Sequence, residues 1–170
     1  MLQLSQALID RPVMSLQTGS QIATAIGPIV NPNNLKIEGF YCIDPTNKHL
    51  VLVSQDIRDI LPQGIVVNDA NVLVESSDLV RLKPIMALQF GLLGKRVETS
   101  SKEKVGKIED YATNIDNMFI QKLYVSQSVF KSFAGGNLGI DRSQIVEITP
   151  KKVVIHDLLG KIPAGAKAIA

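Results

Sequence analysis

Cysteine, histidine and aromatic residues are scarce in this chain. Its 170 residues include one cysteine, two histidines and no tryptophan, and aromatic residues make up 5%. A single cysteine, Cys42, cannot form an internal disulfide, and with two histidines it cannot provide the ligand spacing of a structural zinc site. No Gly-x-Gly-x-x-Gly or Gly-x-x-x-x-Gly-Lys-Ser/Thr motif occurs. We therefore expect no metal site and no cofactor.

Long apolar runs are also missing. No stretch approaches 18 uninterrupted apolar residues, so we expect no integral membrane insertion. The N-terminus reaches Asp10 and Arg11 before an apolar segment of signal-peptide length can form. Together with the single cysteine, this predicts a cytoplasmic location.

Branched aliphatic residues dominate what is present. Hydrophobic residues make up 45% of the chain and charged residues 20%, which is typical of a globular protein. Valine and isoleucine together make up about a fifth of the chain, and these residues favour strands. Most segments alternate apolar and polar residues over about five to eight positions between Gly, Asn, Asp or Pro. The sequence therefore predicts an all-β protein.

The order of these features repeats along the chain at a nearly constant offset. Arg11-Pro12-Val13 and Lys95-Arg96-Val97 each begin a block of about eighty residues. Ile22 then matches Val105, Asn31 matches Asn114, Ile37 matches Ile120 and Phe40 matches Leu123. Each block contains five or six short strands, which can close into a small barrel and so remove exposed edges. The pattern predicts two tandem small antiparallel β-barrels.

Two hairpins are expected to close the blocks. The first joins a strand at 65–67 to one at 72–74, and the second joins Ile145–Ile148 to a strand at 153–155. The segment between the blocks, with Pro84 at its start and Gly91 at its end, has helical spacing of apolar residues. The predicted organisation is a first domain at 1–82, a helical connector at 83–92, a second domain at 93–158 and a C-terminal tail at 159–170.

Several of these residues resemble the PRC-barrel family. Lys104-Val105-Gly106-Lys107-Ile108-Glu109-Asp110-Tyr111 is similar to the family's Gly-Lys-Val-x-Asp opening, and Gly94-Lys95-Arg96-Val97 is similar to its first strand. The first block departs from this pattern, with Ile22-Ala23-Thr24 where the glycine would stand. The family includes the barrel of the reaction-centre H subunit and the C-terminal barrel of a ribosome maturation factor. The resemblance implies a compact barrel that binds macromolecules, and it implies no catalytic residue.

Residues suited to catalysis do not form an obvious group. Catalysis by a nucleophile needs a base beside it, and the only candidates are His49, His156 and Cys42. Both histidines stand beside predicted strands, where they cap or face solvent. Cys42 lies in an alternating run, where a free cysteine behaves as a small buried hydrophobe. We therefore expect a protein that is not an enzyme and has no catalytic residues.

Charge is distributed unevenly along the chain. Residues 1–82 carry a net charge of −3 (five Lys/Arg against eight Asp/Glu), and residues 83–170 carry +5 (thirteen against eight). Lys95, Arg96, Lys102, Lys104 and Lys107 fall close together, with Glu98, Glu103 and Glu109 interleaved. Such a cluster can contact phosphates. Only Tyr111 is close enough to stack on a base.

Two functions from different classes follow from this pattern. The favoured prediction is a non-enzymatic tandem β-barrel scaffold that binds a protein partner at a groove beside the connector, with Met86, Phe90 and Phe130 as contacts. The alternative is an RNA- or ribosome-associated assembly factor that uses Lys102, Lys104 and Lys107 in its basic second half. The sequence leaves the identity of the partner and the oligomeric state open.

Overall fold

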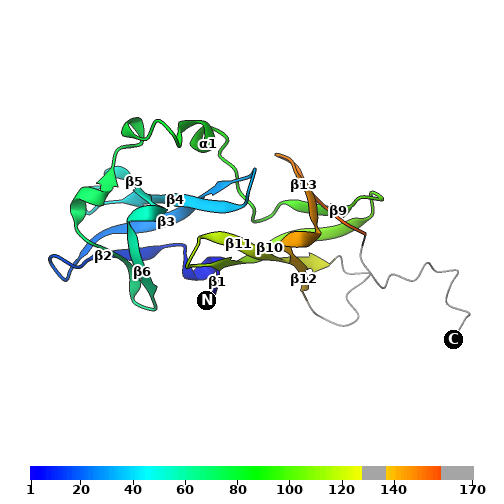
Figure 1. Cartoon of the computed structure of the whole chain (residues 1–170), viewed down its shortest axis with the longest axis horizontal. Coiled ribbons are helices and arrows are strands. Elements are labelled where there is room, and N and C mark those ends of the chain that lie inside the picture. Colours follow the sequence, from blue (N-terminus) through cyan, green and yellow to red (C-terminus); the bar gives the residue numbers. More distant parts are fainter. Residues whose placement is uncertain (128–136, 158–170) are drawn as a thin grey trace, which may run out of the picture.

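A computed structural model of the chain describes residues 1–127 and 137–157, and these residues are mostly β (Figure 1). The strands before the connector are Leu2–Leu4 (β1), Arg11–Ser15 (β2), Gln21–Asn31 (β3), Lys36–Ile43 (β4), His49–Val53 (β5), Ile57–Leu61 (β6), Gly64–Val67 (β7) and Leu73–Val74 (β8). Those after it are Arg96–Thr99 (β9), Lys104–Asn114 (β10), Phe119–Gln127 (β11), Leu138–Asp141 (β12), Ile145–Ile148 (β13) and Lys152–Ile155 (β14). One α-helix of the described part, α1, covers Lys83–Ala87.

All these strands belong to a single mixed sheet. Its order is β13-β14-β9-β10-β11-β4-β3-β2-β7-β6, with β1 on β10, β12 on β11, and β5 between β4 and β8. Two neighbouring pairs, β2 with β7 and β14 with β9, are parallel. Apart from β1, the strands that precede the connector lie toward one end of the long axis and those that follow it toward the other (Figure 1). The predicted all-β class is confirmed.

Bulges interrupt the two central ladders at matching positions. Between β3 and β4 the register shifts at Ala25/Gly27 and at Ile29/Val30. Between β10 and β11 it shifts at Ile108/Asp110 and Ala112/Thr113, which are the same places in the alignment that matches Asn31 with Asn114. A bulge bends its strand and increases the local twist. The two long strands β3 and β10 are therefore bent at the same points.

The turns that follow these long strands also match. After β3, the Leu35 N–H donates to the Asn31 carbonyl oxygen at 2.8 Å, and Leu35 has a φ of 55°. After β10, the Met118 N–H donates to the Asn114 carbonyl oxygen at 2.7 Å, and Met118 has a φ of 62°. In each turn the asparagine side chain accepts a hydrogen bond from the N–H two residues later. The asparagines thus fix both turns.

The two ends of the sheet meet where β4 and β11 pair antiparallel over one residue pair. The Ile37 N–H donates to the Met118 carbonyl oxygen at 2.8 Å, and the Ile120 N–H donates to the Leu35 carbonyl oxygen at 2.9 Å. Arg142 supports this joint, because its guanidinium donates to the carbonyl oxygens of Asn34 and Ile120. The guanidinium also lies 5.0 Å from the centre of the Phe119 ring.

The N-terminal strand pairs with a strand that follows the connector. β1 pairs with residues 112–114 of β10. Directly after it, the Ser5 N–H and hydroxyl donate to the Asp110 carboxylate at 3.0 and 2.5 Å. Leu8, which follows, is fully buried. These contacts hold the N-terminal arm against β10.

Residues 29–31 of β3 correspond to residues 112–114 of β10, but their free edge is covered differently. Within the described part of the chain no strand pairs with it. Pro28 and Pro32 flank it, and proline has no N–H to donate, so this edge is poorly suited to accept another strand. The connector packs beside β3 instead, and Leu92, which precedes the second block as Leu8 precedes the first, is buried.

Two local expectations need correction. The strand at Gly64–Val67 does not form a hairpin with Leu73–Val74: it pairs with β6 and β2, whereas β8 pairs with β5. A 3-10 turn at Ala70–Val72 separates the two segments and redirects the chain. The helix of the connector is also shorter than expected, since it ends at Ala87 and Gln89 already has a φ of 45°. The second hairpin, β13 with β14, is confirmed.

Branched aliphatic side chains fill the core. Fully buried residues come from both ends of the sheet and include Ile37, Phe40, Leu52, Ile65, Ile108, Ile120, Leu123, Ile140 and Ile155. Burying each of these side chains contributes about 1.5–3 kcal/mol. In the described residues no helix is long and apolar enough to span a membrane.

Candidate binding surfaces

The three residues considered for catalysis have different environments: two are exposed and one is buried. His49 begins β5 and His156 follows β14, and both are exposed. The Cys42 side chain is buried in the core, where its thiol lies 3.6 Å from the Phe40 carbonyl oxygen. Burial raises the pKa of Cys42 to about 12, so its thiol stays protonated at neutral pH. This environment keeps Cys42 chemically inert.

A basic surface lies where β9, β10 and the β13–β14 turn come together. Arg96 is paired in register with Lys152 on one side and with Lys107 on the other, so three cations stand in a row across three strands. Two adjoining pockets, of about 350 and 440 Å³, share Arg96 and Glu98 in their lining. We define the basic face by the charged residues of these two pockets: Arg96, Glu98, Lys104, Lys107, Lys151 and Lys152.

Glu98 is the one carboxylate of the basic face, and it is neutralised locally. The Lys152 ammonium forms a salt bridge with it. Within the described residues, Arg96, Lys104 and Lys107 form no salt bridge and have exposed side chains. The face therefore has five cations against one carboxylate, a net charge of +4.

Two of the three lysines predicted as binding residues belong to this face. Lys104 and Lys107 lie on β10 and line its pocket. Lys102 lies beyond them in the β9–β10 turn, with a φ of 64°. Lys151 and Lys152 were not predicted as site residues, because they join the face only through the parallel pairing of β14 with β9. No periodic signal in the sequence indicates that pairing.

The positions of the first half that match the basic face are uncharged. They are found by aligning β2 with β9, β3 with β10 and β7 with β14, because these strands pair in the same way at the two ends of the sheet. Arg96, Glu98, Lys104, Lys107, Lys151 and Lys152 correspond, in this order, to Pro12, Met14, Gln21, Thr24, Gln63 and Gly64. The same backbone arrangement thus carries a net charge of +4 at one end of the sheet and 0 at the other.

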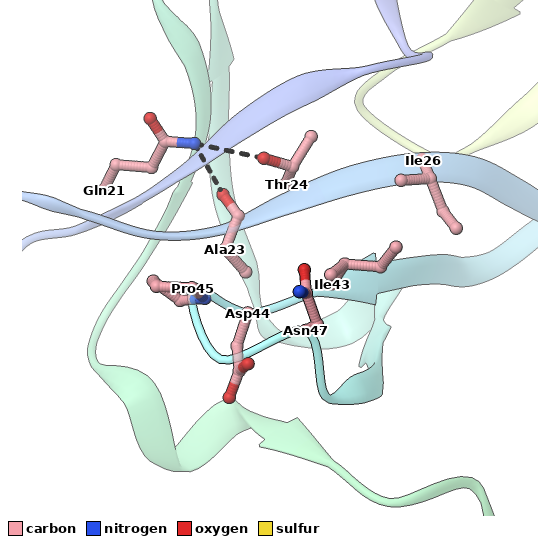
Figure 2. A pocket seen from close by; sticks show the side chains of 8 residues that line it. All are labelled: Gln21, Ala23, Thr24, Ile26, Ile43, Asp44, Pro45 and Asn47. Atoms are coloured by element: carbon pink, nitrogen blue, oxygen red, sulfur yellow. Dashed lines mark hydrogen bonds between the residues drawn. The ribbon is translucent and has the colours of Figure 1, made fainter.

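A pocket of about 570 Å³ opens beside this uncharged surface (Figure 2). Figure 2 shows Gln21, Thr24 and Ile26 of β3 on one side and the β4–β5 turn on the other. The Gln21 amide donates to the Ala23 carbonyl oxygen at 3.2 Å and to the Thr24 hydroxyl at 3.1 Å. Asp44 accepts hydrogen bonds from its own turn, which lower its pKa. Gln21, Thr24 and Asp44 therefore already have hydrogen-bond partners within the protein.

The groove predicted beside the connector is present as a smaller cavity. Phe90 and Ile85 line about 310 Å³ of space next to Ile29, Val30 and Tyr41. The Lys95 ammonium lies 4.7 Å from the centre of the Phe90 ring. Met86 is half-buried and does not line this cavity, and Phe130 lies outside the described residues.

Searches with the sequence find no matching family model and no matching curated protein.

Proposed function

We propose that this chain is a non-enzymatic adaptor made of two copies of one PRC-barrel-like module, and that its basic face binds a protein partner. The matched bulges and turns and the parallel pairs β2–β7 and β9–β14 support the two-module organisation. The observation that carries the proposal is the difference in charge between two surfaces of the same backbone geometry. An uncompensated patch of one sign steers and orients a partner of the opposite sign.

A folded or extended protein segment with acidic residues suits this face better than a nucleic-acid base does. Base stacking needs an exposed aromatic ring beside the cations. Tyr111, the aromatic residue expected to serve, is only 2% exposed, and burial raises the pKa of its hydroxyl. Among the residues that the structure describes, the face therefore offers charge and a pocket, and Tyr111 does not provide a stacking platform.

RNA binding is the second candidate, and the row of cations favours it. Lys152, Arg96 and Lys107 stand on adjacent strands and can meet the phosphates of one backbone. Binding of this kind would be independent of base sequence and would weaken steeply with salt.

Capture of partners by the tagged full chain from lysate of the source organism tests both candidates. Three proteins are compared: the wild type, Lys104→Gln/Lys107→Gln, and a control, Lys48→Gln/Arg58→Gln, which removes two exposed cations from the other end, where Lys48 is salt-bridged to Glu75 and Arg58 donates to Asn68. We expect a protein partner that survives nuclease treatment, is lost with the first variant and is retained with the control. Recovery that disappears with nuclease would favour RNA. Equal recovery by all three proteins would contradict the proposal.

A further inference from the structure

Two like charges stand directly opposite each other on neighbouring strands of the basic face. Arg96 of β9 pairs in register with Lys107 of β10, so their side chains project from the same face of the sheet. Both are exposed, and in residues 1–127 and 137–157 neither takes part in a salt bridge. Glu109, two residues beyond Lys107, does not pair with them either. Because like charges at directly opposite positions destabilise a sheet, this pair lowers the stability of the free protein.

The fold does not need these two charges. In the first half the matching positions are Pro12 on β2 and Thr24 on β3, and these two residues are also paired in register. The same backbone pairing therefore forms between two uncharged side chains. Residues that lower stability without serving the fold are characteristic of functional sites. The charges of Arg96 and Lys107 are thus better explained by a bound anionic group than by the structure itself.

A register shift sets the distance from this pair to the third unpaired cation of the face. The β9–β10 register shifts just after Lys104, which lies opposite Glu98. Lys107 lies opposite Arg96, two residues away from Glu98 on β9. Two residues of a strand span about 7 Å, so Lys104 and Lys107 lie about that far apart along the sheet. The Glu98 carboxylate is engaged by Lys152, which leaves Lys104 free for a ligand.

This spacing is that of alternate residues in an extended chain, whose side chains point to the same side. An extended segment with Asp or Glu at two alternate positions satisfies all three cations: Arg96 and Lys107 share one carboxylate, and Lys104 binds the other. A single anionic group would leave one of these two places unpaired. The residue between the acids points away from the sheet. Beneath the site, Val97 and Val105 are buried in the core, so nothing there selects that residue.

We infer that Arg96, Lys104 and Lys107 recognise an extended partner segment in which two Asp or Glu residues are separated by one residue of any kind. The inference rests on the proposed function and adds the spacing of the partner's acidic residues. Binding also relieves the repulsion between Arg96 and Lys107, because a carboxylate then lies against both. The matching place in the first half, with Gln21 and Thr24 for the two lysines, does not bind such a segment.

A phage-displayed library of random twelve-residue segments, selected on the immobilised full chain, tests the spacing. We expect Asp or Glu at alternate positions and no preference between them. In fluorescence anisotropy, a selected peptide should lose at least about tenfold in affinity when either acid is changed to its amide or when the two acids are made adjacent. Changing the residue between them to Ser should have no effect. Arg96→Gln/Lys104→Gln should lose the peptide, and Lys48→Gln/Arg58→Gln should retain it.

Thermal unfolding of the free protein tests the repulsion. Lys107→Gln removes one of the two opposed charges, so it should raise Tm at low ionic strength. The gain should shrink in about 0.5 M NaCl, because salt screens exposed charges. Lys122→Gln is the control on the neighbouring strand β11. It removes a lysine that has a carboxylate partner, Asp141, and should not raise Tm.

Four results would overturn the inference: no segment is enriched, adjacent and alternate acids bind equally well, Lys107→Gln is no more stable than the wild type at low salt, or a twelve-nucleotide oligouridine binds more tightly than any peptide and is lost with Arg96→Gln/Lys104→Gln. If the lysate experiment retains its protein partner while the peptides fail, the proposed function stands and the inferred spacing is wrong. If the peptides bind and the lysate experiment fails, the reverse holds.

Discussion

Leu35 and Met118 hold matching places in the two central turns, and the carbonyl oxygen of each accepts a hydrogen bond from the strand that follows the other turn. Both residues have a positive φ, a conformation that costs a residue with a side chain about 1–2 kcal/mol. Each turn is held by its own asparagine, and this local geometry sets the position of the two carbonyl groups. The joint between β4 and β11 therefore depends on both turns.

Arg142→Ala should weaken this joint. The substitution removes hydrogen bonds to the carbonyl oxygens of Asn34 and Ile120 and the contact with the Phe119 ring. We expect the free energy of unfolding to fall by about 1–3 kcal/mol, measured by urea denaturation. Arg58→Ala, at an exposed position of β6, is the control and should change it by less than about 0.5 kcal/mol. Equal effects would show that Arg142 has no part in the joint.

Gly106→Ala should be strongly destabilising. The new Cβ atom would lie 1.6 Å from the Ser126 carbonyl oxygen, and neither backbone can move without opening the β10–β11 ladder. We expect a loss of about 3 kcal/mol or more, read from thermal and urea unfolding.

Gly27→Ala is the matched control for that substitution. Gly27 lies in β3, and no atom is found within 4 Å of the position its Cβ would take. The Gly27→Ala substitution should change the free energy of unfolding of the protein by less than about 1 kcal/mol. A Gly106 variant as stable as the Gly27 variant would contradict the close approach of β10 and β11.

The sequence predicted local elements well because their signal is local. Alternation predicted a strand at Ile145–Ile148, which are the bounds of β13. The predicted match of Asn31 with Asn114 agrees with the structure, where both residues begin turns that their side chains hold. The shared spacing of these turns agrees with the matching bulges in the strands before them. Each of these features depends on residues close together in the chain.

Pairings between distant segments were not predictable in the same way. β1 has three residues and β8 has two, which is too short for a period to appear. The attachment of β1 to β10 depends on Leu8 and Asp110, which are far apart in the chain. The cations of the basic face meet for a similar reason, since the β14–β9 pairing brings Lys152 beside Arg96.

Leu8→Ala tests whether the N-terminal arm is an integral part of the fold. Leu8 is fully buried, so removing most of its side chain leaves a cavity. We expect the free energy of unfolding to fall by about 2–5 kcal/mol. Leu2→Ala, in β1 and 52% exposed, is the control and should cost less than about 1 kcal/mol. Amide exchange at residues 112–114 should accelerate with the first variant alone.

Cys42 should be unreactive in the folded protein. Burial raises the pKa of its thiol to about 12 and also shields it from reagents, so the reactive thiolate is scarce at pH 8. A thiol reagent such as 5,5′-dithiobis(2-nitrobenzoate) at pH 8 should label the protein only after denaturation. Rapid labelling without denaturant would contradict the buried position of Cys42.

The turn at Asp44 should make stability depend on pH in the acidic range. The Asp44 carboxylate accepts hydrogen bonds from the Thr46 hydroxyl and N–H and the Lys48 N–H, which lower its pKa. Because the folded-state pKa lies below the unfolded one, the stabilising contribution is complete above the ordinary carboxyl range and is lost as the pH falls through the lowered pKa.

Asp44→Asn keeps an acceptor oxygen but removes the charge. The wild type should therefore be more stable than this variant at pH 7, and the difference should shrink to zero as the pH falls below the folded-state pKa of Asp44, because the wild-type side chain then becomes neutral as well. Urea unfolding at a series of pH values measures it, and carbon-13 NMR of the Asp44 carboxyl gives the pKa directly. A difference that persists unchanged in acid would show that the charge on Asp44 does not stabilise the turn.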